Sequence, residues 1–147
     1  MIGQLRVMAQ HLARVVLAGF MLFAGAGHFT NTGSFLAQVP PFLPAREFIV
    51  QASGVVEIAI AIALLFTRKL RPTVGLLLGV FYVLVFPGNL SQFFTHTDAF
   101  GLNSDGARGM RLLFQPVLVA WALWCTNGWR ERREVVAGLR AWATRAR

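Results

Sequence analysis

The chain has 147 residues, of which 56% are hydrophobic and 14% are charged, and its mean hydropathy is +0.58. Helices of a soluble domain need a polar face, and this composition leaves too few polar residues for one, so we expect a single integral membrane domain. The formal net charge of +8 comes without aromatic residues interleaved in a basic stripe, which argues against a nucleic-acid partner. The single Cys125 excludes an internal disulfide, and we predict no metal site.

The positions of the cations indicate several membrane crossings. Arg6 and Arg14 precede the first apolar run, residues 68–71 after the second run include three cations, and six arginines follow Trp129. Cations at alternate ends of successive spans follow the positive-inside rule. We therefore predict a multi-pass membrane protein with both termini in the cytoplasm.

The first predicted span covers residues 12–29. Its charged start, apolar stretch and Ala24-Gly25-Ala26 sequence are similar to a cleavable signal peptide. The apolar character nevertheless continues to Phe29, and the run is long enough to cross a bilayer, so we expect a retained helix. His28 lies near its far end, beside small residues.

Residues 30–47 form the first predicted loop. The segment 39–44 contains three prolines, which fix φ and disfavour helix in the residue before them, so this part is not an ordinary helix. Because the residues between the prolines are apolar, we expect the loop to lie on the membrane surface or to cap the bundle.

The second predicted span, residues 48–67, contains one charged residue, Glu57. A carboxylate in the middle of a spanning helix costs about 2.5–3.5 kcal/mol on insertion scales, so Glu57 must be neutral, paired or facing a cavity. Ser53, Gly54 and Ala61 lie three or four residues from it and would let a second helix approach closely. We therefore expect Glu57 to point into the bundle.

The third predicted span covers residues 72–94. Pro72 occupies the first helical turn, where proline is favoured, and Gly75 and Gly79 form a small-residue pair that is weak evidence for a helix contact. The Pro87–Asn89 segment is predicted to interrupt the helix and to free a backbone carbonyl. Within a membrane such a backbone is tolerated only inside protein or beside a cavity.

The fourth predicted span, residues 110–128, has a short apolar run. Arg111 and Gln115 lie one helical turn apart on one face, and Pro116 follows them. Tryptophans near the end of this span predict an aromatic belt at the cytoplasmic interface: Trp121, Trp124 and Trp129.

Residues 130–147 are predicted to form a basic amphipathic helix on the anionic inner leaflet. Its apolar residues recur on one face, opposite arginines: Val135, Val136, Leu139 and Trp142. The alternative is a frayed, solvated tail. The predicted fold is thus all-α, with a four-helix transmembrane bundle over residues 1–129 followed by this cytoplasmic helix.

Polar side chains of all four spans are predicted to meet in the outer half of the bundle. Four of them lie near the outer ends of their helices: His28, Asn89, Arg111 and Gln115. Glu57 lies about 15 Å along its helix, within reach of the long Arg111 side chain. We predict a Glu57–Arg111 ion pair, flanked by the other three, in a pocket open to the outside. Alternatively, the cluster is a structural clasp that fixes helix register, with His28 capping a helix and Asn89 satisfying the interrupted backbone. No catalytic residue is assigned.

Six short motifs, in this order, resemble the DoxX-like family of small four-helix integral membrane proteins. They are AGAGHF (24–29), VPPFLP (39–44), SGVVEI (53–58), TRKLRP (67–72), VFPGN (85–89) and RLLFQP (111–116). The resemblance covers all four predicted spans and implies a location in the bacterial cytoplasmic (inner) membrane. A distantly related branch is the DoxD membrane subunit of an archaeal thiosulfate:quinone oxidoreductase, and other members are linked to redox and sulfur stress through partner proteins.

Three functions agree with these features. The first is a redox-linked membrane subunit that binds a quinone or another small lipophile beside Glu57, Arg111 and His28, whose side chains can hydrogen-bond ligand oxygens and exchange protons. The second is a non-enzymatic scaffold that recruits partner proteins. The third is a small-solute transporter, for which the prolines at 87 and 116 are suggestive. The residues point to no cofactor other than a candidate quinone, and they leave open whether the chain is an enzyme and whether it works with a redox partner protein or as a homo-oligomer.

Overall fold

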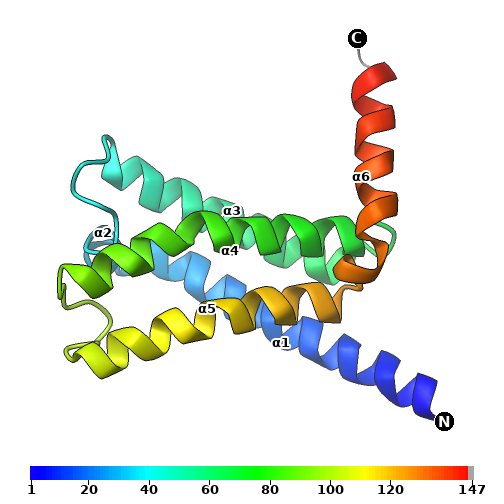
Figure 1. Ribbon diagram of the computed structural model, residues 1–147, viewed down its shortest axis with the longest axis horizontal. Helices are drawn as coiled ribbons and strands as arrows, with labels where there is room; N and C mark the ends of the chain where they lie inside the picture. Colours follow the sequence, from blue (N-terminus) through cyan, green and yellow to red (C-terminus); the bar gives the residue numbers. More distant parts are fainter. Residues whose placement is uncertain (146–147) are drawn as a thin grey trace.

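The computed structural model describes residues 1–145, and this part of the chain contains helices and no strand. The helices, shown in Figure 1, are α1 (Ile2–Thr30), α2 (Thr32–Leu36), α3 (Arg46–Phe66), α4 (Arg71–Phe94), α5 (Asp105–Cys125) and α6 (Gly128–Arg145). The prediction of an all-α fold is confirmed.

Three helices, α1, α3 and α4, are long and apolar enough to cross a membrane. The pair α5 and α6 meets the same criterion only when taken together, and it is bent by 73° at the break, so the number of candidate spans is three or, with the bent pair, up to four. Many large apolar side chains face outward, among them Phe23, Phe66 and Leu84. Soluble proteins rarely expose so much contiguous apolar surface. These are the features of a multi-pass membrane protein.

The long helices α1, α3, α4 and α5 run side by side as two closely packed pairs (Figure 1). The first pair is α1 with α3, and the second is α4 with α5. The pairs are joined by contacts of α1 with α5 and of α3 with α4, whereas α3 and α5 lie diagonally and their backbones do not come close together in the described chain. We call the end that carries α2 the α2 end. The opposite end, where α1 begins and α6 departs, is the α6 end.

The loop after α1 is partly helical, because α2 lies within the segment predicted to be a loop. Ser34 Oγ donates a hydrogen bond to Asn31 Oδ1 (3.1 Å) where α1 gives way to α2. The guanidinium of Arg46, at the start of α3, donates to the carbonyls of Leu36 (2.6 Å) and Val39 (3.0 Å). These bonds fold the proline-rich part of the loop over the α2 end, so it caps the bundle.

Helix α4 runs unbroken through Pro87 to Phe94, so the predicted interruption at 87–89 is wrong. The carbonyl that Pro87 leaves without an intrahelical donor is that of Val83. Gln115 Nε2 of α5 donates to the carbonyl oxygen of the preceding residue, Tyr82 (2.6 Å), and so fastens α5 to the α4 backbone near the proline. Pro116 likewise lies inside α5.

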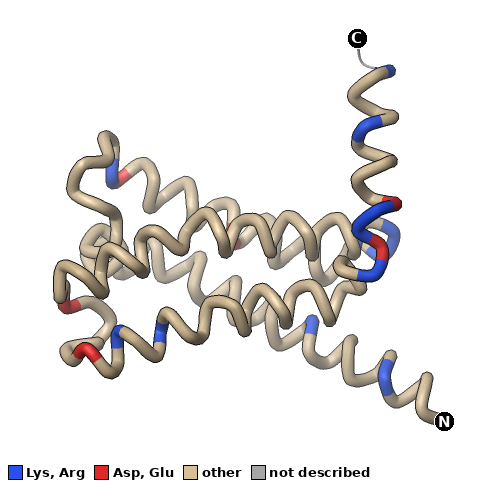
Figure 2. The backbone as a smooth tube through the Cα atoms, viewed as in Figure 1, with Lys and Arg blue, Asp and Glu red and all other residues tan. Residues whose placement is uncertain are grey.

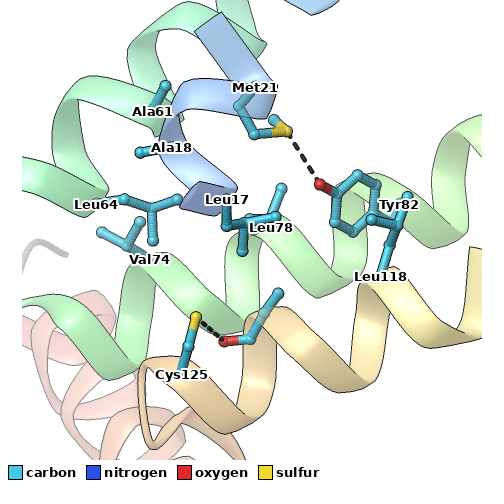
Figure 3. Close-up of a cluster of buried hydrophobic side chains, with 11 residues drawn as sticks. Leu17, Ala18, Met21, Ala61, Leu64, Val74, Leu78, Tyr82, Leu118 and Cys125 are labelled. Atoms are coloured by element: carbon cyan, nitrogen blue, oxygen red, sulfur yellow. Dashed lines mark hydrogen bonds between the residues drawn. The ribbon is translucent and has the colours of Figure 1, made fainter. Parts of the chain in front are cut away.

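The apolar core joins all four long helices toward the α6 end. Its buried members are Leu17, Ala18, Met21, Ala61, Leu64, Val74, Leu78, Tyr82, Leu118, Ala122 and Cys125. Figure 3 shows Tyr82 pointing across to α1, where its hydroxyl donates to the sulfur of Met21 (3.0 Å). Gly75 lets α4 approach the end of α5, because a Cβ there would overlap Thr126. The ends of α4 and α5 are therefore packed closely together here.

Helix α6 leaves the bundle at 73° to α5 and stands across the bundle axis in Figure 1. It covers most of the tail predicted at 130–147, of which residues 146 and 147 lie outside the described chain. Its apolar residues Val136, Leu139 and Trp142 are exposed. Figure 2 shows Lys and Arg gathered near the start of this helix. The predicted helical tail is present, and these exposed apolar residues are not members of the apolar core.

Candidate functional site

A cavity of about 680 Å³ lies between the two helix pairs, on the α2 side of the apolar core. We call it the α2 cavity. Its lining includes all five polar residues that the sequence predicted to meet: His28, Glu57, Asn89, Arg111 and Gln115. Between them the walls are apolar, with Phe20, Phe114 and Leu118 among the lining residues. The capping loop contributes Val39, Pro40 and Leu43.

On the α1–α3 side of the cavity, His28 and Glu57 form a buried pair. His28 Nε2 lies 3.5 Å from Glu57 Oε1, and their side chains are 8% and 12% exposed. The other ring nitrogen, Nδ1, is 2.7 Å from the carbonyl oxygen of Val50. A carbonyl can only accept, so Nδ1 carries a proton and Nε2 is the nitrogen that faces the carboxyl group.

The geometry of this pair leaves two places for one further proton. The proton that joins the two groups is carried either by Nε2 of a charged His28 ring or by the Glu57 carboxyl group beside a neutral ring. At 3.5 Å the two groups attract each other but lie beyond good hydrogen-bond distance. The second carboxyl oxygen, Oε2, is buried and has no hydrogen-bond partner in the described chain. One oxygen of the Glu57 carboxyl group therefore lacks a partner in the wall of the cavity.

Two glycines place His28 against α3. A Cβ at Gly54 would lie 2.7 Å from the Cβ of His28, and a Cβ at Gly25 would lie 3.0 Å from the carbonyl oxygen of Gly54. Only the absence of these side chains allows the two backbones to come so close. The sequence predicted that Gly54 would admit a second helix, and α1 is that helix.

The predicted Glu57–Arg111 ion pair is absent from the described chain. Glu57 lies on α3 and Arg111 on α5, which are diagonal in the bundle, so their backbones do not come close together. The two residues therefore line opposite sides of the α2 cavity. Both side chains line one cavity, as predicted, but the predicted pairing is wrong because it depends on the order of the helices around the bundle, which the sequence does not show.

Arg111 is held by neutral partners instead. Its Nε donates to Asn89 Oδ1 (3.1 Å), and its Nη2 donates to Gln38 Oε1 (3.1 Å). Its guanidinium also lies over the ring of Phe100, 4.8 Å from the ring centroid, in a cation–π contact. A guanidinium has five N–H donors, so several remain for a ligand.

Asn89 and Gln115 form a chain of amide hydrogen bonds between α4 and α5. Asn89 Oδ1 accepts from Arg111, its Nδ2 donates to Gln115 Oε1 (2.7 Å), and Gln115 Nε2 donates to the Tyr82 carbonyl. The direction of the chain is fixed at both ends, because guanidinium can only donate and the carbonyl can only accept. These two amides fasten α4 to α5, which is the role that the clasp hypothesis gave to the whole cluster.

Residues 17–126, which form most of the chain, match the family described as Domain of unknown function (DUF8561). The chain belongs to the DUF8561 family. No curated protein and no solved structure matches it. All five predicted site residues lie within the DUF8561 match, whereas α6 lies beyond it. Because this family description assigns no activity, the DoxX-like relationship and the quinone hypothesis stay predictions.

The sequence analysis missed two polar residues at this site: Gln38, which lines the α2 cavity, and Gln92, to which Gln38 is hydrogen-bonded. Gln38 Nε2 donates to Gln92 Oε1 (2.8 Å) and to Asn89 Oδ1 (3.3 Å), which ties the capping loop to α4. Gln92 lies three residues after Asn89, and residues three or four apart share one face of a helix, so its position could have been predicted. Nothing in the local sequence shows that Gln38 folds over the cavity.

Proposed function

We propose that this DUF8561 protein binds a small lipophile in the α2 cavity, with a quinone as the leading candidate. The observation that carries the proposal is the cavity itself. The buried His28–Glu57 pair lies on one side of it and Arg111 on the other, and the walls between them are apolar. Its volume of about 680 Å³ is within the range of about 300–1,000 Å³ that is typical of ligand pockets.

The chemistry of a quinone head group suits this distribution of polar groups. Such a group is a flat apolar ring with carbonyl oxygens at opposite ends, and these oxygens accept hydrogen bonds. Arg111 offers unused N–H donors on the α5 side, and the His28–Glu57 pair offers a proton on the α1–α3 side. The apolar side chains between them would contact the ring, and the orphan Oε2 of Glu57 would gain a partner.

A redox-linked role follows from the same groups. Reduction of a quinone to a quinol takes up two electrons and two protons. Glu57 and His28 are suited to passing one proton to the nearer oxygen, and the permanent charge of Arg111 stabilises the negative charge on the farther oxygen until water supplies the second proton there. The electrons would come from a redox partner protein or from a small reductant.

Binding of a quinone to the purified protein tests this proposal. The full chain in a mild detergent is titrated with decylubiquinone by calorimetry, alongside Glu57→Gln and Arg111→Gln. Hydrogen bonds to charged groups contribute about 1.5–3 kcal/mol, so each variant should weaken binding by roughly tenfold or more. Glu47→Gln is the matched control, because Glu47 is an exposed residue in the first turn of the same helix. Absence of saturable binding, or an equal loss in the control, would refute the proposal.

The membrane orientation is part of the proposal. The bacterial inner membrane is the location that the DoxX-like resemblance favours, and the cations near the start of α6 favour a cytoplasmic α6 end with both termini inside (Figure 2). The α2 cavity would then open toward the outside. The 73° bend supports an α6 that lies along the membrane surface, with its exposed apolar residues in the anionic inner leaflet.

A further inference from the structure

A second polar cavity lies at the α6 end, on the opposite side of the apolar core from the α2 cavity. It has a volume of about 360 Å³ and is enclosed by the first half of α1, the turn between α3 and α4, and the end of α5. Its lining includes Arg14, Arg68 and Arg71, with no aspartate or glutamate. We call it the α6 cavity.

Arg14 is the unusual member of this lining. It is only 5% exposed, and its Nε has no hydrogen-bond partner in the described chain. Its Nη2 lies 2.6 Å from Nδ1 of His11, the one side-chain partner found for this guanidinium in the described chain. Because a guanidinium only donates, Nδ1 of His11 must accept, and a neutral ring brings no negative charge to the cavity.

No carboxylate in the described chain compensates this cation. The ion pairs found within residues 1–145 join His28, His96 and Arg108 to acidic residues, and none involves Arg14 or Arg71. The Nε of Arg71 is also buried without a partner. Burial of an unpaired charge is strongly unfavourable unless a counter-charge is brought to it.

We propose that the α6 cavity binds the phosphate group of an anion, supplied either by an anionic lipid head group or by free phosphate. Guanidinium groups match phosphate oxygens in pairs of parallel hydrogen bonds, and the guanidinium groups of Arg14 and Arg71, which line the cavity, each keep an Nε–H without a partner. The more exposed Arg68 adds a third positive charge at the rim. This inference is independent of any ligand in the α2 cavity.

The test measures thermal unfolding of the full chain in a maltoside detergent, which carries no phosphate group. One arm compares sodium phosphate with sodium chloride at equal ionic strength. The other compares dioctanoyl-phosphatidylglycerol with dioctanoylglycerol, which lacks the phosphate. At about ten times the dissociation constant, a phosphate-bearing ligand should raise Tm by roughly 3–6 °C.

The arginine variants assign that shift to the α6 cavity. Arg14→Gln and Arg71→Gln should each remove at least half of it. Lys69→Gln is the control, because Lys69 lies in the same turn and carries the same charge but does not line the cavity. If Arg14→Gln does not fold, Arg71→Gln and Arg68→Gln carry the comparison, since both residues are more exposed.

The two arms also distinguish the sources of the phosphate. Shifts in both arms mean that free phosphate reaches the site, whereas a shift in the lipid arm alone identifies a lipid head group. Either result supports the proposal when the arginine variants lose the shift. No shift of the unmodified chain in either arm, or an equal loss in Lys69→Gln, would overturn it.

Discussion

His28 Nε2 lies 3.5 Å from Glu57 Oε1, and this contact joins α1 to α3 at the wall of the α2 cavity. Arg111 lies on the diagonal helix and shares no partner with Glu57 in the described chain. The cavity therefore has two separate polar sides, where the sequence alone had predicted one ion pair.

Two double-mutant cycles test this arrangement. His28→Ala with Glu57→Gln should show a coupling free energy of roughly 0.6–1.7 kcal/mol, the range found for polar contacts between membrane helices. Glu57→Gln with Arg111→Gln should be additive within about 0.5 kcal/mol, as for independent sites. Both cycles are measured by unfolding in mild detergent. Strong coupling in the second cycle with none in the first would restore the original ion-pair prediction.

Gly54→Ala should separate α1 from α3. Its Cβ would lie 2.7 Å from the Cβ of His28, so the helices must shift, at a cost of about 1–3 kcal/mol in the free energy of unfolding. Gly19→Ala is the control, since a Cβ at Gly19 has no neighbour within 4 Å. Thermal unfolding in detergent should show a loss for the first variant and none for the second. Similar values for both would mean that the close crossing at Gly54 does not contribute to stability.

Gln115→Leu should weaken the attachment of α5 to α4. The substitution removes the hydrogen bonds to Asn89 and to the Tyr82 carbonyl, and we expect a loss of roughly 0.6–1.7 kcal/mol for an interhelical polar contact in a membrane protein. Gln51→Leu changes an exposed glutamine of α3 in the same way and should have little effect. Denaturant unfolding in detergent compares the two. Equal stability of both variants would remove the amide chain from the account of the fold.

Helix α6 should lie with its apolar face in the bilayer surface. A spin label at Leu139→Cys is expected to be relaxed more strongly by oxygen, which dissolves in lipid, than by a water-soluble nickel complex. Ala137→Cys lies on the opposite face of the helix and should show the reverse preference. The measurement is power saturation in nanodiscs that contain anionic lipid, and the buried Cys125 is not expected to react with the label. Equal access of the nickel complex to both positions would indicate a solvated tail.

Much of the fold could be predicted because it depends on composition and on local pattern. The apolar runs predicted helices, and the small residues around Glu57 correctly indicated that another helix packs there. The interruption predicted at Pro87 is wrong, because α4 continues through the proline to Phe94, and Gln115 of α5 donates to the α4 backbone nearby, at Tyr82. A sequence read one helix at a time cannot show such a donor.

The candidate site was predicted as a set of residues but not as a set of contacts. The cost of burying a carboxylate in a membrane identified Glu57. The other four residues were identified because each lies near the same end of its helix, and all five line one cavity. The pairing depends on which helices are neighbours around the bundle, and this order is a tertiary property. Gln38 was missed for the same reason, since its role depends on how a loop folds over the bundle.

The central claim, that the α2 cavity holds a small lipophile, is tested most directly by native mass spectrometry of the protein extracted gently from its own membranes. The account predicts a co-purifying compound of quinone size on the unmodified chain and on Glu47→Gln, and its loss from Glu57→Gln. A bare chain, or one that carries only another protein, would contradict the claim and would favour the scaffold hypothesis, in which the polar cluster serves to hold the helices in register.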